Sequence, residues 1–414
     1  MAFDVVRVRR DFPALALKTA HFDGPGGSQV PHQVAQAMAD TLCSGISNRG
    51  GVTAAERRAD SVVTGARAAV GDLLDCPPGC VVFARSMTQA TYDMARAMAK
   101  QWREGDEVVV TRLDHDANIR PWTAAAEAAG ATVRWADFDP ATGTLKVDHV
   151  AEVLSPRTRL VAVTAASNLI GTRPDIPALA EAAHAVGALL YVDGVHLTPH
   201  AAVSLPGLGA DFYACSPYKF FGPHHGLLAA ARPELLEQVH PDKLLPSADT
   251  IPERFELGTL PYELLAGTTA AVDFIADLGG KGDGGDGGAG GGGTGGASRR
   301  ARVAASMREV EAHEEALFDR LLDGLAAIGG VTVHPAPRPR TPTVLFSVAG
   351  HSPQAVYEHL AALGVNAPAG SFYAIEAATR LGLGAPGAVR AGISPYNDAG
   401  DVDRLLSGVR ELAR

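Results

Sequence analysis

The sequence predicts an α/β fold in which a large domain carries a mostly parallel sheet flanked by helices, followed by a smaller α+β domain. From about residue 60, short apolar runs alternate with helical patterns, as a parallel sheet with crossover helices requires. Three of the predicted strands end in polar residues, and ligands of open α/β sheets bind at the carboxyl ends of the strands. The pattern therefore also predicts a ligand site at one edge of the sheet.

Each predicted element comes from this alternation. Apolar runs predict large-domain strands at residues 80–84, 107–110, 132–136, 160–164, 188–192 and 212–215. Helical patterns at 118–129 and 177–186 are each followed by a glycine, which suits the residue after a helix end. The smaller domain is predicted from a long helical pattern at 298–328, strands at 331–333 and 344–348, and helices at 353–363 and 401–412.

We expect four segments along the chain. They are an N-terminal segment that joins the small domain (1–50), the large domain (51–278), a glycine-rich insert (279–297) and the small domain (298–414). The insert holds 13 of the 46 glycines and has the composition of a flexible linker, so we expect a disordered surface loop there.

Composition excludes several classes of protein. The 414 residues include 36 basic and 46 acidic side chains, a net charge of −10, which argues against nucleic-acid or anionic-membrane partners because these require clustered Lys and Arg. Four scattered cysteines do not make a disulfide scaffold, and no apolar run approaches a membrane span. The first residues lack the apolar core of a signal peptide, so we expect a cytoplasmic protein.

The polar strand ends place three residue types at the predicted sheet edge. His115 lies in the loop after the second predicted strand, Asn168 follows the fourth, and Asp193 directly follows the fifth. Any one of them alone is more typical of a turn or a helix cap. Their recurrence at three strand ends indicates that one cleft collects them.

Lys219 follows the last predicted strand in a segment bounded by Gly and Pro, with the hydroxyl of Ser216 three residues earlier. Composition alone would make it an ordinary loop lysine. However, a lysine amine, a strand-end carboxylate and an aromatic or imidazole plane are the groups that a pyridoxal-phosphate (PLP) site needs.

From about residue 20 onward, the chain resembles the class V aminotransferase and cysteine desulfurase group of fold-type I PLP enzymes. The resemblance covers about nine-tenths of the chain and includes the Asp-Gly-Pro-Gly-Gly segment at 23–27. It implies a seven-stranded sheet, PLP as cofactor, an amino acid as substrate and a homodimer with a shared active site.

The resemblance also assigns roles at the sheet edge. Lys219, in Ser-Pro-Tyr-Lys, matches the catalytic lysine that forms a Schiff base with PLP, and Asp193 matches the catalytic partner of the pyridine nitrogen. The catalytic His115 matches the histidine that stacks on the cofactor ring. The resemblance places Asn168 and His196 at the cofactor's 3′ oxygen.

Further matches concern the phosphate and the substrate. Ser216 and Tyr218 match phosphate contacts, although many relatives have a histidine at the position of Tyr218. Asn118, from the motif His-x-x-Asn, is expected to bind substrate. Thr88 and Gln89 lie in a turn that matches the family's phosphate turn, and such a turn before a helix offers free N–H groups to an anion. Without the resemblance, the same turn is an ordinary helix cap.

Two segments nearer the C-terminus complete the match. Thr259, in Phe-Glu-Leu-Gly-Thr, matches the threonine that reaches the phosphate of the neighbouring subunit. Arg390 matches the arginine that takes the substrate carboxylate, a good use of the guanidinium fork. The alternative for Arg390 is a surface ion pair.

One family feature is missing from the chain. Desulfurases of this group carry a cysteine on the loop before the carboxylate arginine, whereas here that loop, at 370–380, has none and no cysteine follows Cys215. A persulfide relay by that route therefore has no thiol to carry it.

We expect a PLP enzyme in which Lys219 removes the Cα proton of an amino acid, with β-elimination by a C–S lyase as the favoured outcome. An aminotransferase, an amino-acid epimerase and a non-catalytic PLP-binding protein are the alternatives. A metal hydrolase is disfavoured and no metal is expected, because no His-Glu-x-x-His motif connects His196, His200, His224 and His225.

Overall fold

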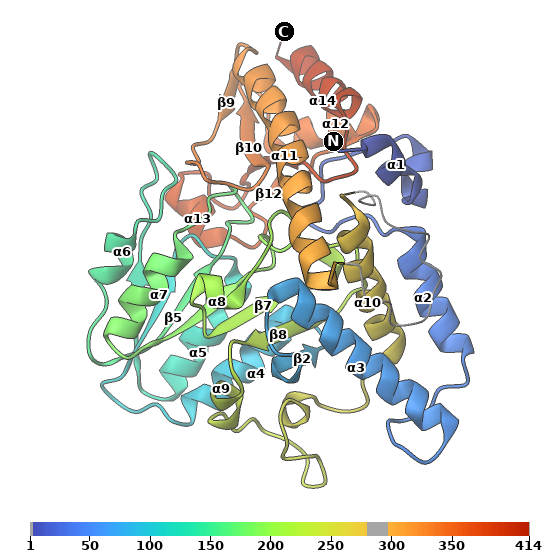
Figure 1. Ribbon diagram of the computed structural model, residues 1–414. Coiled ribbons are helices and arrows are strands. Elements are labelled where there is room, and N and C mark those ends of the chain that lie inside the picture. The colour runs from blue at the N-terminus through green and yellow to red at the C-terminus, as the bar shows by residue number, and fades with distance from the viewer. Residues whose placement is uncertain (1–2, 280–296, 414) are drawn as a thin grey trace.

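A mixed sheet of seven strands forms the centre of the large domain (Figure 1). The computed structural model describes residues 3–279 and 297–413. The strand order is β2-β8-β7-β6-β5-β3-β4, and β8 alone runs antiparallel to the other six. These strands are β2 (Val81–Ala84), β3 (Glu107–Thr111), β4 (Thr132–Ala136), β5 (Thr158–Thr164), β6 (Leu189–Asp193), β7 (Phe212–Cys215) and β8 (Gly226–Ala230).

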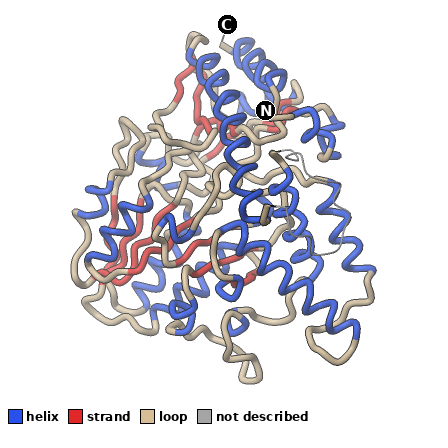
Figure 2. Tube along the Cα trace, viewed as in Figure 1, coloured by secondary structure: helices blue, strands red, loops and turns tan. Residues whose placement is uncertain are grey.

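Two separate helical layers cover the faces of this sheet (Figure 2). In β3, Val109 belongs to one hydrophobic cluster while Val108 and Val110 belong to the other, because successive side chains of a strand point to opposite faces. The Val109 side is covered by α3 (Ala54–Leu74), α7 (Ile176–Ala185), α10 (Tyr262–Asp277) and α11 (Arg299–Ala326). The other side is covered by α4 (Met87–Ala99), α5 (Arg120–Ala128) and α9 (Pro233–Glu237).

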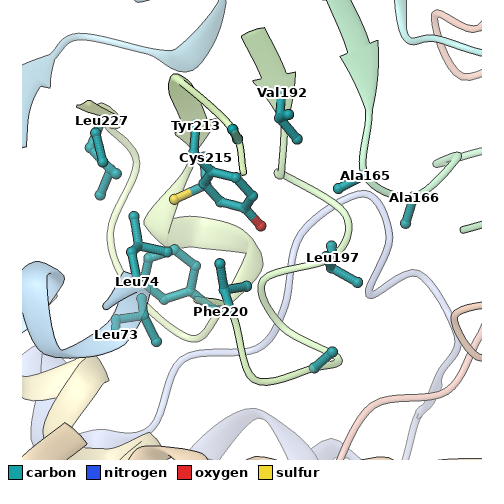
Figure 3. Close-up of a cluster of buried hydrophobic side chains, with 14 of the residues drawn as sticks. Leu73, Leu74, Ala165, Ala166, Val192, Leu197, Tyr213, Cys215, Phe220 and Leu227 are labelled. Carbon is teal, nitrogen blue, oxygen red and sulfur yellow. The ribbon is translucent and has the colours of Figure 1, made fainter. Parts of the chain in front are cut away.

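The end of β7 shows how this alternation separates core from cavity. Figure 3 shows Tyr213 and Cys215 on one side of β7, next to Leu74 and Phe220. The thiol of Cys215 therefore belongs to the core, whereas the next residue, Ser216, lines the cavity described below.

A four-stranded antiparallel sheet of order β12-β13-β10-β9 forms the small domain. Ala20 and Phe22 are buried in its core together with residues from 318 to 409. This packing supports the proposal that the N-terminal segment joins the small domain, although α2 (His32–Cys43) packs on α10 of the large domain. The small-domain elements are β9 (Val331–Val333), β10 (Thr343–Val348), β12 (Ala369–Gly370), β13 (Ala388–Gly392), α12 (Pro353–Ala362), α13 (Ile375–Arg380) and α14 (Ala399–Leu412), with β1 (Ala20–His21) paired to β11 (Val365–Asn366).

The predicted strands and helices named above agree with observed elements within two residues, and β8 is the large-domain strand that the residue pattern did not predict. Residues 280–296 of the predicted insert lie outside the described residues. No described helix is both long and apolar enough to cross a bilayer. The remaining helices are α1 (Val5–Arg10), α6 (Val147–Ala151) and α8 (Leu205–Leu208).

Gly226 explains why β8 starts where it does. A Cβ atom at this position would lie 2.0 Å from the main-chain nitrogen of Met87 and 2.1 Å from the carbonyl carbon of Ser86. Only glycine allows the first residue of β8 to touch the beginning of α4 so closely. This contact fixes the N-terminus of α4 against the sheet edge.

Candidate active site

A cavity of about 670 Å³ lies at the carboxyl ends of β5, β6 and β7. His115, Asn168 and Asp193, which come from three different strand ends, all line it together with Lys219. The small domain contributes Arg390 from β13. The structure therefore brings the residues of the predicted sheet-edge site to one cavity.

Lys219 ends a short 3-10 turn, Pro217–Lys219, that directly follows β7. Its Nζ donates a hydrogen bond of 2.6 Å to the main-chain carbonyl of Pro25. Burial, and then the Arg390 cation, lower the pKa of Lys219 to about 7, against the opposing effect of Asp193. A large fraction of the amine is therefore unprotonated near neutral pH, as a base or nucleophile requires.

Asp193 is the last residue of β6 and is 4% exposed. Burial raises its pKa to about 6, while the main-chain N–H of Val195, which donates to Oδ1 at 2.9 Å, and the charge of Lys219 act in the other direction. The carboxyl group is mostly ionised above that pH. The cavity thus contains a buried carboxylate and a buried amine that influence each other.

His115 begins the loop turn Asp116–Asn118 and accepts a hydrogen bond of 3.0 Å at Nδ1 from the N–H of Ala117. The neutral ring therefore carries its proton on Nε2. Burial, followed by the charges of Lys219 and Arg390, lowers the pKa of His115 to about 4, so the ring is neutral at pH 7. It stacks on Tyr373 with 5.5 Å between ring centres.

His196 lines the cavity and is 3% exposed. Its Nε2 is 3.0 Å from Thr343 Oγ1 and 3.1 Å from Thr341 Oγ1. Burial holds the pKa of His196 well below its usual range, so this ring is also neutral. The two threonines attach it to the beginning of β10 in the small domain.

Arg390 is 2% exposed and forms no ion pair within the described residues, so the surface-ion-pair alternative is wrong. Its Nη1 donates a hydrogen bond of 2.8 Å to the main-chain carbonyl of Asn168. Its guanidinium carbon lies 3.7 Å from the centre of the Phe372 ring. Within the described chain, Nε is buried without a hydrogen-bond partner. Burial lowers the pKa of Arg390 to about 9, which still leaves the group charged at pH 7.

The side-chain amide of Asn168 has a hydrogen-bond partner at its nitrogen but none at its oxygen. Nδ2 donates 2.9 Å to the main-chain carbonyl of Phe372, whereas Oδ1 is buried and has no partner among the described residues. A buried acceptor without a partner is costly unless a ligand supplies a donor. The same holds for the unpaired Nε donor of Arg390.

The beginning of α4 forms one wall of the cavity. Ser86 caps this helix of 13 residues by accepting a hydrogen bond of 3.1 Å from the N–H of Gln89, and Met87 and Thr88 line the cavity. The positive end of the helix dipole therefore faces the cavity. Ser216 and Tyr218 line it as well.

Three predicted site residues do not line the cavity. Gln89 donates its main-chain N–H to the capping hydroxyl of Ser86, and its side chain is not part of the lining. Asn118 is fully buried. Its Nδ2 donates a hydrogen bond of 2.7 Å to Asp114, and its Oδ1 accepts one of 3.1 Å from Trp122. The expected contact of Asn118 with substrate is therefore not supported. Thr259 is exposed, and a role in the active site would require a second subunit.

Other residues of the lining were not predicted from the sequence. Tyr92 lies one helical turn after Thr88 on α4, a spacing that could have indicated it. Pro25 and Gly26 belong to the matched 23–27 segment, which carried no residue role. Phe372 and Tyr373 had no signal in the sequence, because their position depends on an unusual backbone conformation.

Histidine and cysteine side chains elsewhere do not form a competing site. Within residues 3–279 and 297–413, no group of three or more His, Cys, Asp or Glu residues could hold a metal ion. His224 stacks on Tyr218, while His225 is 2.6 Å from Thr268 Oγ1. No cysteine of this part of the chain lines the cavity.

Comparison with known proteins places this fold and cavity in a family. Residues 20–282 and 296–405 match the family described as Aminotransferase class-V. The chain is 30% identical to the Aminotransferase-like protein FGM3 of Gibberella zeae, over 98% of this chain and 97% of that protein. It is 31% identical to a probable cysteine desulfurase of Pseudomonas aeruginosa, over 96% of each.

A solved structure shows the same fold. The cysteine desulfurase CsdA of Escherichia coli superposes with a TM-score of 0.84 at 26% identity, over 99% of this chain and 98% of that one. The α/β fold expected from the resemblance, with its large sheet and its small domain, is therefore confirmed.

Proposed function

This chain belongs to the class-V aminotransferase family, and we propose that it is a PLP-dependent enzyme that acts on an amino acid. One observation supports the proposal most directly: Lys219 and Asp193 line the same cavity at the sheet edge. Lys219 is a buried amine with a lowered pKa, and Asp193 is a buried carboxylate. Both groups are costly to bury, and such groups gather at functional sites.

The residues present fit the cofactor. Lys219 would hold its aldehyde carbon, Asp193 would keep its ring nitrogen protonated, and the neutral ring of His115 offers an apolar face to its plane. Thr88 and the N-terminus of α4 supply donors for a phosphate, as would Ser216 and Tyr218. Asn168 and His196 would bind the 3′ oxygen.

When bound, PLP supplies an electron sink for the negative charge that develops at the substrate Cα. The chain supplies the proton transfer. The free Lys219 amine takes the Cα proton, because burial keeps much of it unprotonated at pH 7. Asp193 remains ionised in the same range.

Arg390 would orient the substrate by its carboxylate. Its Nε has no partner within the described chain, and its Nη2 faces Gly26, where a Cβ would be only 3.7 Å away. A carboxylate would give the Nε–H an acceptor. Bidentate pairing of this kind fixes direction as well as position.

We further propose that the reaction is a β-elimination, a C–S lyase reaction that does not pass through a protein persulfide. The buried thiols of Cys76 and Cys80 have pKa values raised to about 12 and about 11, chiefly by burial, and that of Cys215 is raised further. Such thiols are poor nucleophiles. Cys43 is exposed but does not line the cavity. In the proposed elimination the Cβ–S bond breaks, and the sulfur would leave as a free thiol or sulfide without bonding to a protein cysteine.

Transamination and epimerisation are the alternative outcomes. The match to the class-V aminotransferase family and to an aminotransferase-like relative favours transamination in particular. All three outcomes begin with the same removal of the Cα proton, so the proposed roles of Lys219 and Arg390 hold for each.

A homodimer would complete the site. Glu256, held by Arg67 at 2.8 Å and by the N–H of Phe83 at 2.9 Å, anchors the segment whose next residues, Leu257 to Thr259, are exposed. This anchored loop would offer Thr259 to the phosphate of a second copy. A molar mass of one chain in light scattering of the loaded protein would contradict this part of the proposal.

The test has two steps. Purified protein is loaded with PLP, and we expect a visible absorption band. Borohydride should then abolish this band and leave a covalent mass increase on the peptide that contains Lys219. Product analysis with cysteine, with its S-conjugates, and with an amino acid plus a keto acid then separates lyase from aminotransferase. Failure to load would refute the cofactor assignment, and a loaded protein without product would identify a non-catalytic binding protein. A protein persulfide would refute the proposed sulfur route.

A further inference from the structure

Phe372 and Tyr373 form an aromatic wall on the small-domain side of the cavity. Both have positive φ, 52° and 58°, a region that side-chain-bearing residues rarely adopt. Two adjacent residues in this conformation must be held by their surroundings.

Two hydrogen bonds hold this wall. Asn168 Nδ2 donates 2.9 Å to the carbonyl of Phe372, and the N–H of Asp116 donates 2.7 Å to the carbonyl of Tyr373. The donors come from the loops after β5 and β3, so the large domain fixes a small-domain loop. Both carbonyls are thereby directed at the large domain.

One ring lies on the proposed substrate-binding arginine, and the other lies on the histidine proposed to contact the cofactor. Phe372 covers the Arg390 guanidinium at 3.7 Å, and Tyr373 stacks on His115 at 5.5 Å. Because a carboxylate pairs with a guanidinium in its plane, Phe372 on the face leaves the edge of Arg390 free for it. Tyr92 and Tyr218 add two further rings to the lining.

The charges around the wall are already compensated. The third basic residue of the lining after Lys219 and Arg390 is Arg120, which pairs with Asp116 at 2.8 Å and Glu376 at 2.7 Å. The acidic residues of the lining are Asp116, so paired, and Asp193. Lys219 and Asp193 form no ion pair within the described residues, and under the proposed function both would be engaged by the cofactor. With Arg390 bound to the substrate carboxylate, no charged side chain of the described lining is then left for a charged substrate side chain.

We propose that Phe372 and Tyr373 determine substrate specificity, selecting α-amino acids with a neutral apolar or aromatic side chain and rejecting acidic and basic ones. This inference rests on the proposed function, since it takes Arg390 as the carboxylate site. Tyr373 is 76% exposed, so its part of the wall is open to solvent. A charged side chain that lies against the rings gains no charged partner, whereas an apolar one gains contact with the rings.

The test measures binding without turnover, using α-methyl amino acids, which have no Cα proton to lose. Calorimetry on the purified, PLP-treated protein compares α-aminoisobutyrate with α-methylphenylalanine, α-methylglutamate and α-methyllysine. We expect the phenylalanine analogue to bind at least about tenfold more tightly than either charged analogue. Equal affinity for all three would overturn the proposal.

The double variant Phe372→Ala/Tyr373→Ala should lose this preference, measured as the affinity for α-methylphenylalanine relative to that for α-aminoisobutyrate. A double glycine variant at the same positions removes the rings and also tolerates the positive φ, so it serves if the alanine variant folds poorly. Tyr357→Ala, on α12 outside the lining, is the matched control and should retain the preference.

The outcomes distinguish a failure of the specificity proposal from a failure of the proposed PLP-dependent function. A retained preference in both double variants, or an equal loss for α-aminoisobutyrate and the phenylalanine analogue, would overturn a specificity role for the wall. Failure of the proposed function appears instead as the absence of a visible band, and the calorimetric comparison still decides whether the wall discriminates.

Discussion

Lys219 and Pro25 are joined by a hydrogen bond of 2.6 Å from Nζ to the main-chain carbonyl oxygen. The next residue, Gly26, lies beside Nη2 of Arg390, where a Cβ would be 3.7 Å from that nitrogen. One short turn near the N-terminus therefore touches both the amine and the guanidinium that we propose act on the amino acid.

Lys219→Ala should abolish covalent capture of PLP and lower kcat by about 100-fold or more, because it removes both the attachment point and the base. Mass spectrometry after borohydride reduction measures the capture. Lys219→Arg keeps a cation but has no free amine at neutral pH, so it should fail equally. Capture retained in either variant at wild-type yield would show that another lysine serves.

The rate of PLP capture by the cofactor-free protein should rise with pH and level off above about 7. Burial lowers the pKa of Lys219 to about 7, and only the unprotonated amine attacks the aldehyde. At pH 6 roughly a tenth of the amine is free, so capture should be about tenfold slower than at the plateau. Stopped-flow absorbance gives the profile.

The same profile has an internal check, because the Arg390 cation lowers the pKa of Lys219. Arg390→Gln removes that charge and should raise the pKa, which moves the midpoint to higher pH. A midpoint that stays in place or moves to lower pH would show that the two groups do not interact.

Arg390→Gln should also raise KM for the amino acid substrate by about 10- to 100-fold, since charged hydrogen bonds are worth about 1.5–3 kcal/mol. Arg120→Gln is the matched control. Arg120 lines the same cavity but is occupied by Asp116 and Glu376, so its loss should change KM much less. Steady-state kinetics give KM for both variants. A larger rise in KM for Arg120→Gln than for Arg390→Gln would assign the substrate carboxylate to Arg120 instead.

Gly226→Ala should lower the free energy of unfolding by about 2 kcal/mol or more and weaken PLP binding, because its Cβ would meet the main chain of Ser86 and Met87 at about 2 Å. Denaturant unfolding and a PLP titration measure the two effects. Gly65→Ala, inside α3 with nothing within 4 Å of its Cβ, should instead stabilise by about 0.5–1 kcal/mol. Unchanged PLP affinity in Gly226→Ala would show that the start of α4 does not form the phosphate site.

Local patterns were sufficient for much of this fold. The strand at 132–136 and the strand at 212–215 were predicted with the observed bounds. The first alternates exposed with partly buried residues at the edge of the sheet, and the second is a continuous buried run, and both are local patterns typical of strands. The pattern missed β8, which runs antiparallel to both of its neighbours and begins at a glycine that follows a histidine.

The sequence pattern also predicted the site residues that lie at strand ends. His115, Asn168, Asp193 and Lys219 reach one cavity because parallel strands end at the same edge, a consequence of topology that the alternation of elements already implies. Asn118 is the third residue after His115, and it does not line the cavity, because its side chain bonds to Asp114 and Trp122 instead.

By itself, then, the sequence determined the order of the elements, the acidic charge, the missing cysteine near residue 370 and the chemical groups at the strand ends. Only the tertiary structure decided that Arg390 is buried under Phe372, that Tyr373 stacks on His115 and that Pro25 accepts from Lys219. The reason is that each of these contacts joins segments more than 190 residues apart, or depends on positive φ values that neither residue type favours. Local periodicity cannot predict such contacts, because they form only where the small domain packs against the edge of the large-domain sheet.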